Sequence, residues 1–88
     1  MKIKSDFILR KVADTDVVLP LGAASVDFNG LLKLNESSVL LWKALESGAD
    51  LEDLVAVLTG EYDVDSATAR ADIEAFIARL NEIGCLEM

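Results

Sequence analysis

One short apolar segment that runs directly into a helix start constrains the fold of this chain more than any other feature. The segment consists of Leu31, Leu32, Lys33 and Leu34, and Asn35 follows at once as a favoured helix N-cap. A strand that ends in a cap leaves little chain to cover its outer edge. Because free N–H and C=O groups at a sheet edge bind an added strand, we expect this edge to receive a peptide or a second copy of itself.

The residues before this segment predict further β-structure. We expect one strand over Phe7–Val12 and a second over residues 16–19, which are nearly continuous in apolar side chains, with a turn at Asp14 and Thr15 between them. Pro20 has no N–H to donate to a neighbouring strand, so it should end the second strand or lie on an edge.

A hairpin is predicted next. Asn29 and Gly30 lie between apolar residues, and Asn-Gly is the strongest short hairpin signal because a type I′ turn needs positive φ at both positions. Two registers remain open. A two-residue turn places Phe28 opposite Leu31, whereas a straight strand through the glycine aligns Phe28 with the leucines that follow.

The rest of the chain predicts three helices. The N-caps are Asn35 for a helix over about residues 36–46, Asp50 for the second, and either Asp65 or Ser66 for the third; Gly48 and Gly84 fit the left-handed position that ends a helix. Apolar residues recur at helical spacing in the second helix (Leu51, Leu54, Val55, Leu58) and in the third (Ala69, Ile73, Phe76, Ile77, Leu80). The pattern predicts an α+β, winged-helix-like fold, with a small antiparallel sheet of three to four strands followed by three α-helices.

Length and composition fit one domain over residues 1–88. With 52% apolar and 27% charged residues the chain should be globular, and its longest apolar runs are far shorter than the roughly 20 residues that a membrane helix needs. The polar N-terminus does not resemble a signal peptide, and a single cysteine fits a reducing compartment. We therefore expect a cytoplasmic protein that does not bind a membrane.

The side chains that most enzymes depend on are scarce in this sequence. It contains no histidine and one cysteine, Cys85, so neither a nucleophilic triad nor a structural zinc site is expected. The glycines are dispersed and form no phosphate loop. Asp50, Glu52 and Asp53 lie in the first turn of a predicted helix, where the helix dipole favours carboxylates, and the same applies to Asp63 and Asp65. We expect no enzymatic activity, no cofactor and no metal, and we expect Cys85 to be a buried structural thiol.

Charge is distributed unevenly along the chain. Residues 1–43 carry six basic and five acidic residues, whereas residues 44–88 carry two basic and eleven acidic residues. A winged-helix DNA-binding regulator is the natural alternative for such a fold, but it needs a basic recognition helix. The second predicted helix has no Lys or Arg, and the third has only Arg70 and Arg79. We therefore expect no nucleic-acid partner, while a partner with basic character is permitted.

Several short motifs resemble those of PqqD-like proteins in the same order. They are Phe7-x-Leu9-Arg10, Val17-Val18-Leu19-Pro20, Phe28-x-Gly30, Leu34-Asn35-Glu36, Trp42, Tyr62-x-Val64-Asp65 and Ala71-Asp72-x-Glu74-x-Phe76. The resemblance covers nearly the whole chain. PqqD proper typically has a Tyr-Pro-Glu-Gly turn where this chain has Phe28-Asn29-Gly30, so the resemblance leaves the pathway open.

The resemblance implies a stand-alone recognition element of ribosomally synthesised, modified peptides. Such modules bind the leader segment of a precursor peptide as a strand added to the edge strand, with side chains in a groove beside the third helix. They present the peptide to a modifying enzyme, often a radical S-adenosylmethionine enzyme. The expected function is thus that of a peptide chaperone, as a monomer or weak dimer.

The expected peptide-binding residues fall into two groups. Leu31, Leu32, Lys33 and Leu34 would offer the strand edge, with Lys33 also meeting an acidic leader residue, and Arg70, Ile73, Glu74 and Ile77 would form the groove wall and its charged rim. Two other interpretations remain open. The apolar residues of the third helix also fit a plain core, as does Trp42, and the edge strand also fits a self-associating structural domain.

Overall fold

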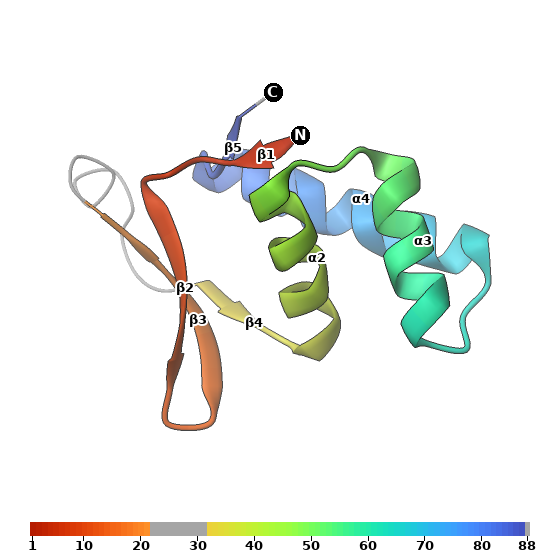
Figure 1. The fold of residues 1–88 in the computed structure, drawn as a ribbon, viewed down its shortest axis with the longest axis horizontal. Coiled ribbons are helices and arrows are strands. Elements are labelled where there is room, and N and C mark those ends of the chain that lie inside the picture. The colour runs from red at the N-terminus through yellow and green to blue at the C-terminus, as the bar shows by residue number, and fades with distance from the viewer. Residues whose placement is uncertain (22–31, 88) are drawn as a thin grey trace.

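The computed structural model describes residues 1–21 and 32–87, which form two small sheets and three helices (Figure 1). The elements are β1 (Lys2–Ile3), β2 (Phe7–Val12), β3 (Thr15–Pro20), β4 (Leu32–Leu34), α2 (Glu36–Ser47), α3 (Leu51–Glu61), α4 (Ser66–Ile83) and β5 (Leu86–Glu87). The α+β fold with an N-terminal antiparallel sheet and three following helices is therefore confirmed. The predicted hairpin around Asn29-Gly30 and its register, as well as Leu31, lie outside the described residues.

The larger sheet has the strand order β2-β3-β4, and both pairings are antiparallel. The β2–β3 hairpin turns at residues 13–14, where Ala13 adopts a φ of 55°. Pro20 ends β3, as predicted. In the other pairing Asp16 lies opposite Leu34 and Val18 opposite Leu32. Within the described residues β4 is therefore an outer strand of this sheet.

Each helix begins at one of the predicted caps. The Asn35 side chain accepts from the Ser38 N–H at 2.9 Å, and the Asp65 side chain accepts from the Thr68 N–H at 2.7 Å. At α3, Asp50 forms a full capping box with Asp53, since each side chain accepts from the other residue's backbone N–H. These caps explain why the sequence predicts the helix starts closely; of the two candidates for the third cap, the structure uses Asp65.

The two predicted helix-ending glycines differ in conformation. Gly84 is left-handed (φ 86°, ψ 27°), and its N–H is directed at the Leu80 and Asn81 carbonyls. Gly48 also has a positive φ of 96°, but its ψ of 126° lies outside the left-handed helical region. Both positions disfavour a side chain, because positive φ strains any residue that carries a Cβ.

A second sheet, which sequence reasoning missed, joins the two ends of the chain. β1 pairs with β5 in antiparallel fashion, with Ile3 opposite Leu86, and the N and C labels lie close together in Figure 1. The Lys4 N–H donates to the Cys85 carbonyl at 2.8 Å, and the Ala49 N–H donates to the Met1 carbonyl at 2.9 Å. Strands of two residues show no alternation of apolar side chains, so the sequence carries no periodic signal for them.

The core lies between the larger sheet and the helices. Its fully buried large side chains come from every layer: Val18, Trp42, Leu45, Leu54, Ile73, Leu80 and Cys85. The prediction that Trp42 and Cys85 are buried is confirmed. Among the described residues, no helix is long and apolar enough to cross a bilayer.

Candidate functional site

The direction of the backbone groups in β3 determines which groups of β4 face outward. The Leu21 N–H donates to the Asp6 carbonyl at 2.6 Å, so the odd-numbered residues of this strand direct their backbone groups toward β2. In an antiparallel pair successive residues alternate in this direction. Asp16 and Val18 therefore face β4 and share hydrogen bonds with Leu34 and Leu32. Between those two leucines, the N–H and C=O of Lys33 point away from β3.

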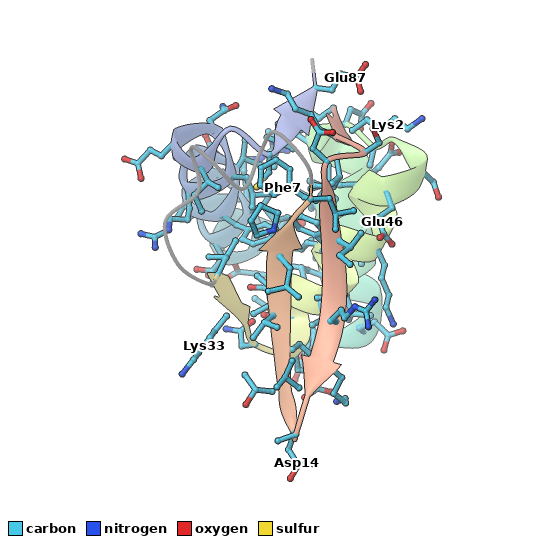
Figure 2. The ribbon with its side chains drawn as sticks, turned by 90° about the vertical axis from the view of Figure 1, so that its left-hand side faces the viewer. Lys2, Phe7, Asp14, Lys33, Glu46 and Glu87 are labelled. Carbon is cyan, nitrogen blue, oxygen red and sulfur yellow. The ribbon has the colours of Figure 1, made fainter. Side chains whose placement is uncertain are left out.

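The side chains of β4 reinforce this arrangement. Leu32 and Leu34 are buried against the core, whereas the Lys33 side chain is exposed. Figure 2 shows the Lys33 side chain extending away from the body of the protein. The backbone edge at Lys33 can thus accept a strand without disturbing the core, which meets the geometric requirement for strand addition.

Helix α4 presents two different sides to its surroundings. Arg70, Glu74 and Ile77 share one side because they are spaced by four and three residues. This side faces α3: Arg70 forms an ion pair with Glu52 at 2.5 Å, and Glu74 and Ile77 line a shallow groove of about 400 Å³ that also contains Met1 and Leu51. The structure brings these three predicted residues together on the side of α4 that faces α3.

The other side of α4 reaches the cavity at the end of β4 through Asp72. Asp72, Phe76, Arg79 and Ile83 share this side through spacings of four, three and four residues. Asp72 lines a cavity together with Asn35, the residue that follows β4, and Phe76 and Ile83 are half-buried. Sequence reasoning placed none of these four in the site. Their spacing was visible in the sequence, but which side of the helix faces the edge strand depends on how the helix crosses the sheet.

Ile73, which was predicted as part of a groove wall, lies between these two sides. Its side chain is 0% exposed and belongs to the core. Leu32 and Leu34 are likewise buried, so in this arrangement only their backbone borders the edge. Of the predicted residues described here, Lys33 combines an exposed side chain with outward backbone groups.

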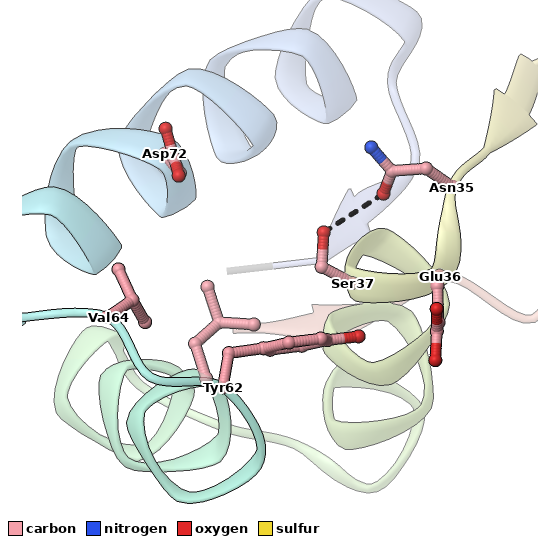
Figure 3. Close-up of a pocket in the computed structure, with 7 residues that line it drawn as sticks. Asn35, Glu36, Ser37, Tyr62, Val64 and Asp72 are labelled. Carbon is pink, nitrogen blue, oxygen red and sulfur yellow. Dashed lines mark hydrogen bonds between the residues drawn. The ribbon is translucent and has the colours of Figure 1, made fainter.

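A cavity of about 300 Å³ lies where β4 ends and α2 begins (Figure 3). Leu58, Tyr62 and Val64 supply its apolar wall, and Asn35, Glu36, Ser37 and Asp72 supply its polar rim. In Figure 3 the Tyr62 ring extends toward the first turn of α2, and Asp72 lies on the α4 side. The cavity is therefore built by three helices around the point at which the edge strand ends.

Hydrogen bonds and charge define the polar rim. The Asn35 Oδ1 accepts from the Ser37 Oγ at 3.0 Å in addition to its capping bond. Burial raises the pKa of Tyr62, and the carboxylates of Glu36 and Glu61 raise it further. The phenol therefore stays protonated at neutral pH and is available as a donor. Among the described residues no cluster of three or more His, Cys, Asp or Glu side chains is arranged to hold a metal ion.

The comparison with protein families agrees with this architecture. The model of the family described as coenzyme PQQ synthesis protein D (PqqD) matches residues 17–86, which include β4, all three helices and the cavity between them. The chain belongs to the PqqD family. No curated protein matches the sequence significantly.

Two solved structures resemble this PqqD-family chain over nearly its whole length. The first, TbiB1 in complex with the TbiA(beta) leader peptide, has 28% sequence identity and a TM-score of 0.79 and covers 99% of this chain and 95% of its own. The second is a lasso peptide synthetase B1 complexed with the leader peptide. It has 25% identity and a TM-score of 0.75, and the match covers 96% of this chain and 93% of its own. In both structures the similar protein is bound to a leader peptide.

Proposed function

We propose that this PqqD-family chain binds the leader segment of a ribosomally synthesised precursor peptide by strand addition to β4. The observation that carries the proposal is the outward N–H and C=O of Lys33 on β4, an outer strand of the sheet within the described residues. The similar solved structures support it, because they are complexes of such proteins with leader peptides. Backbone hydrogen bonds would set the direction of the leader, and pockets for alternate side chains would select its sequence.

The side chains of the leader that point toward α4 would contact Phe76 and Ile83. Both are half-buried against the core, so each leaves apolar surface for a ligand. Leu31, which lies outside the described residues, remains a predicted contact of the leader. The other side of α4, with Arg70, Glu74 and Ile77, would serve as a second contact surface if the leader continues around the helix.

We propose that the chain acts as one domain and adaptor in the cytoplasm, presenting the leader to a separate modifying enzyme. A radical S-adenosylmethionine enzyme is the partner that the family resemblance favours. A DNA-binding role has little support, because α3 carries no Lys or Arg and Arg70 of α4 is already paired with Glu52.

The test is an amide NMR titration with the leader of a small precursor peptide encoded beside this chain, applied to two matched variants. Lys33→Pro removes the outward N–H on the β4 edge. Lys11→Pro is the control, because Lys11 is also exposed and its N–H points outward from the opposite edge, on β2. Proline is tolerated where the missing N–H would have faced solvent. We expect saturable shifts at residues 32–34 in the wild-type and Lys11→Pro proteins and none in Lys33→Pro.

Each alternative predicts a different result. Equal binding by both proline variants would refute strand addition at β4, even if the peptide binds elsewhere. Line broadening at β4 that grows with protein concentration in the absence of peptide would favour self-association through the same edge. A dispersed amide spectrum for each variant establishes that it remains folded, so a loss of binding can be attributed to the edge itself.

A further inference from the structure

The residues that line the cavity at the end of β4 indicate which kind of leader side chain it can bind. It combines an apolar wall (Leu58, Tyr62, Val64) with carboxylates from two helices, Glu36 of α2 and Asp72 of α4. The residues that line it include no lysine or arginine within the described chain. We propose that this cavity binds a lysine or arginine side chain of the leader, an inference that rests on the proposed function.

The apolar wall fits the carbon stem of such a side chain. Lys and Arg bury their methylene groups against apolar surface while the charged head remains near polar groups. Leu58 is buried, and Tyr62 and Val64 are half-buried around the cavity. The Tyr62 ring, which extends toward α2 in Figure 3, offers a face to the cation as well.

The carboxylates of the rim are not neutralised by neighbouring cations. The ion pairs found within the described residues, Lys11–Asp16 and Arg70–Glu52, involve neither Glu36 nor Asp72. Two basic residues lie two positions from a rim residue. Lys33, before Asn35, directs its side chain away from the body of the protein (Figure 2), and Arg70, before Asp72, is paired with Glu52.

An anionic occupant is the competing possibility, because the N-terminus of α2 also borders the cavity. A helix N-terminus is equivalent to roughly half a positive charge, whereas Glu36 and Asp72 carry two full negative charges. The Ser38 N–H of that first turn is moreover already bound to the Asn35 side chain. The balance of charge therefore favours a cation.

Strand addition would bring the leader to this cavity in a defined register. Asn35 lies two residues beyond Lys33, at the rim of the cavity. In a sheet, residues that lie opposite one another direct their side chains to the same face, so the leader residue opposite Lys33 points away from the body of the protein. The leader residue opposite Leu34, whose side chain is buried, points toward the helices. We expect the basic residue at or next to that position.

The test uses a display library of random 12-residue peptides, selected on the purified full-length chain. The wild-type protein should enrich peptides with Lys or Arg at one fixed position of an extended apolar pattern. Glu36→Gln with Asp72→Asn should remove this preference and weaken a selected basic peptide roughly tenfold or more, as expected for loss of charge-assisted contacts. Glu36→Lys with Asp72→Lys should shift the preference at that position to Asp or Glu.

A matched control separates local from general charge effects. Glu46→Gln with Glu82→Gln makes the same change in net charge on the same two helices at exposed positions outside the cavity, and it should keep the preference. Peptides whose capture depends on Lys33 but show no basic preference, or an acidic one, would overturn this inference alone. If selection yields no peptide whose capture is lost in Lys33→Pro, strand addition itself fails, and the inference fails with it.

Discussion

Cys85 illustrates how the fold changes the chemistry of a single side chain. It lies directly after the left-handed Gly84, its N–H donates to the Leu80 carbonyl at 3.0 Å, and its side chain is 0% exposed. Burial raises the pKa of the thiol to about 11, against a smaller opposing effect of Lys4. A thiol that resists ionisation is a poor nucleophile, which agrees with a structural role.

The raised pKa of Cys85 predicts a loss of stability in alkaline solution. Between pH 9 and 11 the unfolded chain releases the thiol proton while the folded chain retains it, so the free energy of unfolding falls as the pH rises. The fall should be on the order of 1–3 kcal/mol, since one pKa unit corresponds to about 1.4 kcal/mol. Urea unfolding from pH 8 to 11 measures it. In Cys85→Ala the free energy of unfolding should fall less between pH 8 and 11, and the remaining fall is due to Tyr62, whose pKa is also raised. An unchanged fall would show that Cys85 is not its source.

At the scale of the element, local signals explain what the sequence could and could not predict. β2, β3 and the three helix starts were predicted because short apolar runs, Pro20 and the caps at Asn35, Asp50 and Asp65 act within a few residues. The candidate site was predicted at β4 for the same reason. On α4 the predicted residue Ile73 is fully buried in the core. Because Ile73, Phe76 and Ile77 all lie on one apolar face, only tertiary packing decides which of them stays accessible to a ligand.

The capping box of α3 predicts a measurable stability difference. The Asp53 N–H donates to the Asp50 Oδ1 at 2.8 Å. Asp50→Ala removes this acceptor and should lower the free energy of unfolding by roughly 1 kcal/mol. Asp50→Asn keeps an acceptor at the same position and should lose much less. Chemical denaturation followed by circular dichroism measures both. Equal losses for the two variants would mean that the cap itself contributes little.

Because β1 and β5 pair with each other and join the two ends of the chain, we expect these ends to stabilise the helices. Ile3 lies opposite Leu86, and both are buried in the common core. Ile3→Ala removes buried methyl groups and should destabilise the protein by about 2–5 kcal/mol. Lys2→Ala, at the exposed neighbouring position of the same strand, should change stability by less than about 0.5 kcal/mol. Similar midpoints for the two variants in thermal unfolding would show that the terminal sheet is not coupled to the core.

For the whole molecule, the uneven charge predicts how fast a basic leader associates. Residues 44–88 carry eleven of the sixteen acidic side chains, so the helical half of the protein attracts cations over distances comparable to the Debye length of ~10 Å at 0.1 M salt. Charges distant from the contact act mainly on the association rate, whereas charges in the contact also act on dissociation.

Glu46→Gln with Glu82→Gln should therefore slow association of a basic peptide modestly and leave its dissociation rate unchanged. Glu36→Gln with Asp72→Asn should raise the dissociation rate as well, because these carboxylates border the cavity. Stopped-flow measurements between 20 mM and 500 mM salt separate the two effects. If both double variants changed only the association rate, the cavity carboxylates would act by attraction at a distance and would not hold the leader side chain.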